Sequence, residues 1–140
     1  MIFNPRIAIA AVMATCLAAQ SGETFKTRLS AVAADARTRA ALAGSGRALA
    51  TLNGTKLIIS GEFEGLLSPA TKAELHSAPA AGVRGPVIAP LSVTAAESGM
   101  IAGIVDLTAA QITSLRKGGI YIQIYSQKAP DGVLWGWLLR

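Results

Sequence analysis

Short strand-type segments, each followed by a turn signal, constrain the fold of this chain more than any other feature. The clearest turn signal is Asn53-Gly54, because both residues tolerate positive φ and the pair separates segments 47–52 and 56–63. Further strand-type segments lie at 25–30, 73–77, 87–93, 100–107, 120–126 and 133–139. This spacing is typical of an antiparallel sandwich or barrel. We predict an all-β fold, an antiparallel β-sandwich of about seven to eight short strands.

Helical signals are few. Thr108 and Gln111 have the spacing of a capping box, and Gly118 ends the segment, so we predict one short helix over 109–117. Ser68-Pro69 has the form of an N-cap followed by a first-turn proline, which predicts one helical turn. The alanine-rich stretch within 31–46 fits either a short helix or a long loop, and the sequence leaves these two alternatives open.

The first 20 residues have the order of a secretory signal peptide. A cationic start that includes Arg6 precedes the uncharged run 7–19, and small or polar residues follow it. The run is shorter than the roughly 18–20 residues needed to span a membrane. We therefore expect residues 1–20 to be a signal peptide and 21–140 to form one exported domain. The single cysteine, Cys16, lies in this leader; lipidation of Cys16 is an alternative that would anchor the protein to a membrane.

Composition excludes several classes of protein. The chain is 51% hydrophobic and 15% charged, too apolar for a disordered protein. Its net charge of +5 comes from scattered cations rather than from a basic stripe with interleaved aromatic residues, so we expect no nucleic-acid partner.

The residues available for catalysis are also few. His76 is the only histidine, and no cysteine follows the leader, so one subunit lacks the residues for a multi-histidine or Cys/His metal site. No nucleophile elbow or phosphate-binding glycine motif is present. We therefore expect no catalytic residue and no cofactor. His76 remains a weak metal candidate, as a lone ligand to an ion shared with a partner; the alternative is a hydrogen-bonded histidine.

The last twenty residues contain both tryptophans and both tyrosines of the chain. Strand alternation places these side chains together with apolar neighbours on one side of each of the last two strands, while the opposite sides are also apolar. We predict that this hairpin is a partner interface, because aromatic residues are enriched at interfaces. The predicted interface residues are Tyr121, Gln123, Tyr125, Val133, Trp135, Trp137 and Leu139. The alternative is that both faces are internal, with one packed under the alanine-rich segment.

Four stretches carry a family resemblance: Ala-Glu-Leu-His at 73–76, Gly-Val-Arg-Gly-Pro-Val at 82–87, and the segments 115–126 and 130–138. They resemble the CHRD (chordin-type) domain, a secreted β-sandwich module, and the resemblance covers 25–139. Glu74 and Tyr125 stand where that family has histidines, and Gln123 stands where it has asparagine. Of the histidines relevant to a metal, only His76 remains.

In size and export the chain also resembles the small subunit of the membrane-bound quinoprotein alcohol dehydrogenase of acetic acid bacteria. This resemblance implies a non-catalytic accessory subunit whose partners are a quinoprotein dehydrogenase subunit and a multihaem cytochrome c. It also implies a periplasmic location on the outer side of the cytoplasmic membrane, with membrane contact only through partners or a lipidated Cys16. The alternatives are a copper- or zinc-binding oxidoreductase resembling superoxide dismutase, with His76 as one ligand, and a free-standing extracellular protein-binding module.

Overall fold

The computed structural model describes residues 22–140, so the predicted leader and Cys16 lie outside the described residues. The described part contains eight antiparallel strands and one short α-helix, which confirms the all-β prediction and the predicted helix. The strands are β1 (Glu23–Ala31), β2 (Ser45–Asn53), β3 (Lys56–Glu64), β4 (Ala70–Ser77), β5 (Val87–Val93), β6 (Gly99–Asp106), β7 (Ile120–Ser126) and β8 (Leu134–Trp137); the helix is α2 (Ala109–Arg116). No helix within 22–140 has the length and apolar character that crossing a membrane requires.

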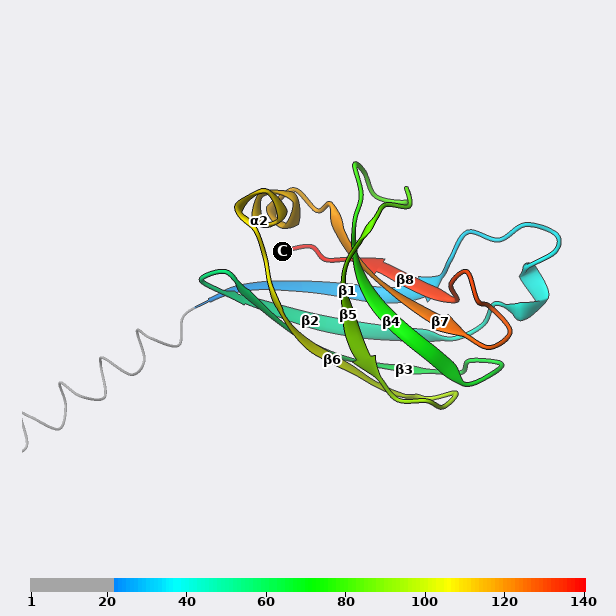
Figure 1. The fold of residues 1–140 in the computed structure, drawn as a ribbon. Helices are drawn as coiled ribbons and strands as arrows, with labels where there is room; N and C mark the ends of the chain where they lie inside the picture. The colour runs from blue at the N-terminus through cyan, green and yellow to red at the C-terminus, as the bar shows by residue number, and fades with distance from the viewer. Residues whose placement is uncertain (1–21) are drawn as a thin grey trace, which may run out of the picture.

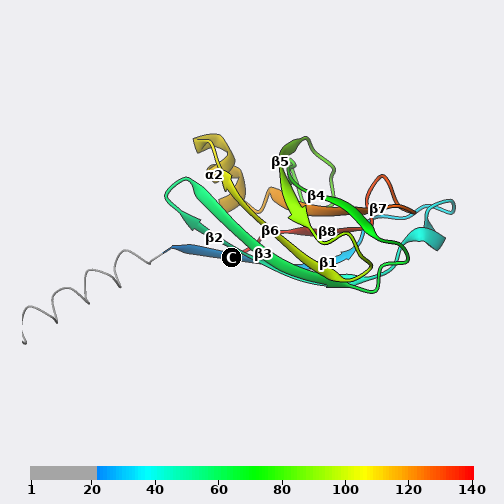
Figure 2. The ribbon, with the colours of Figure 1, turned by 60° about the horizontal axis from the view of Figure 1, so that its bottom comes forward.

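The strands form a closed barrel in the order β1-β2-β3-β6-β5-β4-β7-β8, with β8 paired to β1. The predicted antiparallel all-β fold is therefore correct, but its strands close into a barrel and do not form the predicted sandwich. Every strand pairs on both edges, and β1 and β5 join the two sides of the barrel. On β1, Glu23 to Leu29 pair with β2, and the last residues, Ser30 and Ala31, pair with β8. Likewise, β5 pairs with β4 and ends on β6. Figures 1 and 2 show β1, β2, β3 and β6 on one side of the barrel, with β4, β7 and β8 on the other.

Alternation along each strand fills the barrel interior with apolar side chains. On β7, Ile120, Ile122 and Ile124 point inward and are fully buried, together with Phe25 of β1 and Leu75 of β4. The tyrosines of β7 consequently lie on the outer face of the barrel. The helix α2 lies at one end of the barrel and adds the buried Leu115 to the core (Figure 1).

Local signals were largely accurate at the turns and caps. Thr108 and Gln111 form the capping box, and Gly118 has φ +77° just after α2. The β2–β3 turn lies one residue later than predicted, on Gly54 and Thr55. Its φ is +63° at Gly54 and negative at Thr55, the pattern of a type II′ turn, which favours glycine at the first central position.

Two helical questions are also resolved. No helical turn forms at Ser68-Pro69, where the chain bends into β4. The stretch within 31–46 is mainly a loop, with a single 3₁₀ turn at Arg39–Ala41 before β2 begins at Ser45. This short turn buries no residue, so nothing in the core supports a longer helix there.

Candidate functional site

A row of aromatic rings crosses the outer face of β4, β7 and β8. His76 stacks on Tyr121 with ring centroids 4.8 Å apart. Tyr121 lies 4.6 Å from Trp137, and Trp137 lies 4.9 Å from Trp135. We call these four residues the aromatic row. Because the hydrophobic core lies inside the barrel, these rings are packed on its outside, where sheet faces normally carry polar side chains.

The loop 78–86, which we call the strap, covers part of the aromatic row. The Arg84 guanidinium lies 5.4 Å from the Trp135 ring and donates a 2.9 Å hydrogen bond to the Asp131 carbonyl. The backbone N–H of Gly85 donates to the Tyr121 hydroxyl at 3.0 Å. As a result, Tyr121 is only 1% exposed although it lies on the outer face.

Burial divides the predicted interface residues into three groups. The buried residues are Tyr121, Gln123, Tyr125 and Val133. Trp135 and Trp137 are half-buried, and Leu139 is exposed. The strap contacts Tyr121 through Gly85, whereas Tyr125 contacts His76 and Lys72. The indole N–H of Trp137 is buried without a hydrogen-bond partner. Only the two tryptophans and the exposed leucine remain available to a partner in this conformation.

His76 lies at the centre of a polar cluster. Its Nδ1 lies 2.9 Å from the Gly85 carbonyl, and its Nε2 lies 3.0 Å from the Tyr125 hydroxyl. A carbonyl can only accept, so Nδ1 carries the proton in this arrangement and Nε2 of the neutral ring accepts from Tyr125. The carboxylate of Glu74 lies 3.6 Å from Nε2, and Lys72 lies 3.8 Å from the same carboxylate.

The environment of Tyr125 strongly favours its neutral form. Burial raises the pKa of the Tyr125 hydroxyl far above its usual value, and the hydrogen bond and negative charge of Glu74 raise it further. Among residues 22–140, no group of three or more His, Cys, Asp and Glu side chains is arranged to hold a metal ion. His76 therefore has one carboxylate neighbour, and its closest side-chain hydrogen-bond partner is a tyrosine.

A second surface was missed by the sequence analysis. The outer face of β2, β3 and β6 exposes four large aliphatic side chains, which we call the apolar patch. They are Leu49 (43% exposed), Ile58 (42%), Met100 (64%) and Ile104 (68%). Ile58 and Ile104 face each other in the β3–β6 register. The sequence of segment 100–105 could have predicted this surface. Its residues are apolar on both faces of the strand, as in the final strand.

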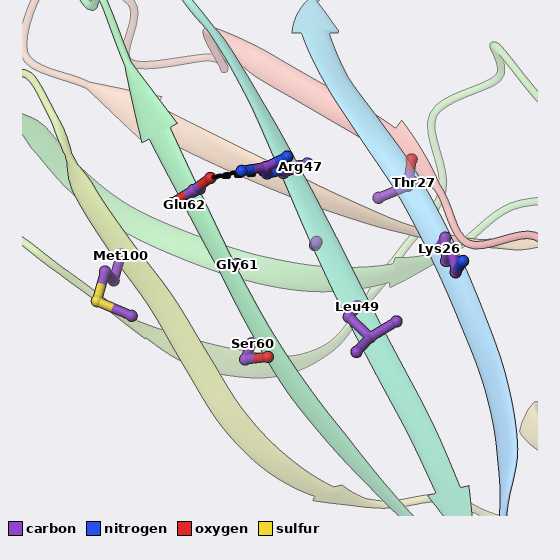
Figure 3. A pocket seen from close by; sticks show the side chains of 9 residues that line it. Lys26, Thr27, Arg47, Leu49, Ser60, Gly61, Glu62 and Met100 are labelled. Carbon is purple, nitrogen blue, oxygen red and sulfur yellow. Dashed lines mark hydrogen bonds and ion pairs between the residues drawn. The ribbon is translucent and has the colours of Figure 1, made fainter.

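Two shallow grooves connect the apolar patch with the final hairpin. The first, of about 430 Å³, lies over β1, β2, β3 and β6; Figure 3 shows Leu49, Ser60 and Met100 on its neighbouring strands. The second, of about 560 Å³, lies where β8 meets β1 and is lined by Trp135, Trp137 and Leu139 among others. Both grooves share Lys26 and Thr27, so they adjoin, and the patch residues Leu49 and Met100 line the first of them.

A family model matches most of the barrel-forming part of the chain. The family model described as the CHRD domain matches residues 25–138, from the first strand to the end of the barrel. The chain belongs to the CHRD domain family. No curated protein and no solved structure matches this CHRD domain. The glycine-proline segment at 82–87 begins in the strap and ends at the first residue of β5, and it supplies the Gly85 contacts to His76 and Tyr121.

Proposed function

We propose that this chain is a non-catalytic, exported accessory subunit that docks on a larger periplasmic oxidoreductase complex associated with the membrane. The observation that carries the docking proposal is the apolar patch. Leu49, Ile58, Met100 and Ile104 are each more than 40% exposed and lie on three neighbouring strands. Soluble monomers rarely expose large contiguous apolar surfaces, and those that exist are often binding sites.

The charge around the patch indicates an acidic partner surface. Lys26 and Arg47 line the first groove, and Arg28 joins Lys26 in the second. Glu62 is the single carboxylate residue lining these two grooves, and its Oε1 is paired with Arg47 at 2.7 Å. An apolar centre with a cationic rim would complement a partner with an apolar centre and an acidic rim, since complementary charges favour the correct encounter.

The tryptophans extend the same docking surface to the barrel seam. Trp135 and Trp137 are half-buried and lie beside the exposed Leu139 in the second groove. Large aromatic side chains are frequent anchors at interfaces because they bury much area at low entropic cost. The class of partner, a quinoprotein dehydrogenase with a multihaem cytochrome c, is part of the proposal; its support is the chain's size and its leader-like first segment.

The patch is tested by placing charge on it. We expect the pair Met100→Asp and Ile104→Asp to weaken binding to the partner complex at least tenfold, because two charges would be buried without partners. Both side chains are more than 60% exposed, so the fold should be retained. The measurement is affinity capture from native membranes, with quantification of stoichiometric companions. The matched control is Val87→Asp, which changes a 51% exposed residue of β5 that lines neither groove.

The outcome that supports the proposal is a stoichiometric oxidoreductase subunit that is lost with the double variant and kept with the control. Trp135→Ser is a second test variant, placed in the groove at the other end of the proposed docking surface. Equal capture by the wild type, the double variant and Trp135→Ser would rule out this docking face. Capture of no stoichiometric companion by the wild type would rule out the accessory role.

A further inference from the structure

We infer that a cavity at one end of the barrel binds a small aliphatic carboxylate, an acid of about four carbon atoms. The cavity has a volume of about 120 Å³ and lies between the loop after β1, the strap and the loop between β7 and β8. We call it the end cavity. Figures 1 and 2 show the two loops at the same end of the barrel, opposite α2. The end cavity shares no lining residue with the two docking grooves, so this inference does not depend on the docking face.

Three cations from separate segments line the end cavity. They are Arg37 of the loop after β1, Arg84 of the strap and Lys128 of the last loop. Asp131 is the single carboxylate residue in the lining, so positive charge is in excess. None of these four side chains forms an ion pair within residues 22–140. Charges of one sign around a recess attract counter-ions, because the low-dielectric walls focus the field. The end cavity therefore favours an anion.

Arg84 is held in place while part of its guanidinium group is unused. Its Nη1 donates to the Asp131 carbonyl at 2.9 Å and to Gln123 Oε1 at 3.4 Å, and its guanidinium carbon lies 5.4 Å from the centre of the Trp135 ring. The hydrogen bonds that Arg84 makes within residues 22–140 use Nη1 alone. Its Nη2 and Nε thus keep N–H groups for a ligand, and carboxylate oxygens accept strong hydrogen bonds from a guanidinium group.

Hydrogen bonds also fix the backbone that carries the other two cations. Asp35 Oδ1 accepts from the backbone N–H of Arg37 at 2.8 Å, and the Ser68 hydroxyl oxygen accepts from the backbone N–H of Lys128 at 2.9 Å. The side chains of Arg37 and Lys128 are exposed. The two loops are therefore positioned before a ligand arrives, and only the long cationic side chains have to turn toward it.

The inner wall of the end cavity is apolar. Val32 and Ala129 are buried, and the half-buried Ala41 and Leu42 pack against the hydrophobic core. Because the cations are exposed, they form the mouth and the apolar side chains form the interior. A small inorganic anion would leave this interior unused, whereas an aliphatic tail would fill it. The volume of about 120 Å³ is that of about four water molecules in the liquid, which is too small for a sugar, a nucleotide or a long acyl chain.

The test is titration of the purified full chain with sodium butyrate at constant ionic strength, followed by tryptophan fluorescence. We expect saturable binding of one equivalent, with a change in fluorescence because Arg84 lies over the Trp135 ring. Butanamide and n-butylamine have the same tail without the negative charge, and they should bind at least tenfold more weakly. Affinity should rise severalfold from acetate to butyrate as the tail fills the cavity, and it should rise no further for octanoate.

Two sets of variants locate the ligand. Arg37→Gln with Lys128→Gln should weaken butyrate binding at least tenfold, because two charged donors are lost. The matched control is Arg39→Gln, which removes an exposed cation of the adjacent 3₁₀ turn that does not line the end cavity, and it should keep the wild-type affinity. Asp131→Asn should strengthen binding severalfold, since the one lining carboxylate would no longer repel the ligand. All four side chains are exposed, so each variant should fold.

Three results would overturn the proposal. The first is wild-type protein that binds no butyrate although circular dichroism shows it to be folded. The second is equal affinity of the double variant and Arg39→Gln, which would mean that butyrate binds elsewhere. The third is an affinity that keeps rising up to octanoate, which would place the tail on an open apolar surface. Met100→Asp with Ile104→Asp lies outside the end cavity and should leave butyrate binding unchanged, so the two proposals fail separately.

Discussion

Gly85→Ala is expected to lower the free energy of unfolding by about 3 kcal/mol or more. A Cβ at this position would overlap the carbonyl oxygen of Ser77 and lie 2.9 Å from Cα of Ala78. Both obstacles are backbone, so the strap must move rather than a side chain. Moving it breaks the Gly85 hydrogen bonds to His76 and Tyr121 and leaves buried polar groups unpaired, at about 1–3 kcal/mol each.

Urea unfolding followed by tryptophan fluorescence measures this effect, since Trp135 and Trp137 lie in or beside the covered surface. The control is Gly82→Ala in the same strap, where a Cβ would meet nothing within 4 Å. That substitution carries only the strain of φ +81°, about 1–2 kcal/mol. If the two variants are equally stable, the strap is not packed on the aromatic row in solution, and Tyr121 is exposed there.

The strands and the helix were predictable because their signals are local. Alternation, the glycine at 54 and the capping box from Thr108 to Gln111 each act within a few residues, and the observed elements begin and end close to the predicted ranges. Closure of the barrel was not predictable in this way. It depends on Ser30 and Ala31 pairing with Trp135 and Leu134, residues about a hundred positions later in the chain, and no local pattern specifies that contact.

In the candidate site, too, the local features were predictable and the long-range contacts were not. Alternation correctly placed Tyr121 and Tyr125 on one face of β7, opposite the buried isoleucines. The burial of Tyr121 depends on the strap, whose Gly85 reaches it across 36 residues of sequence. The pairing of His76 with Tyr125 spans 49 residues and was likewise hidden. An apolar strand face in the sequence predicts that another segment or a partner packs on it. Which segment packs there depends on contacts between residues far apart in the chain.

Closure of the barrel can be tested directly at Gly136, where β8 lies against Thr27 and Arg28 of β1. We expect Gly136→Ala to lower the free energy of unfolding by about 3 kcal/mol, because a Cβ there would overlap Thr27 Oγ1 and lie 2.6 Å from the Arg28 carbonyl oxygen. Gly136 has no positive φ, so the cost is purely steric. The same change should accelerate hydrogen exchange at the amides of β1 and β8 that form the seam.

The matched control is Gly103→Ala on β6. The one atom that its new Cβ would crowd is Leu91 Cδ2 at 2.7 Å, the end of a flexible side chain that can turn aside, so we expect a loss below about 1 kcal/mol. In an open sandwich, β8 and β1 would not pair, and Gly136 would have room for a methyl group. Equal stability of the two variants, with unchanged exchange at the seam, would therefore favour the sandwich. A selective loss in Gly136→Ala would favour the closed barrel, in which the second groove and its tryptophans lie directly beside the cations of β1.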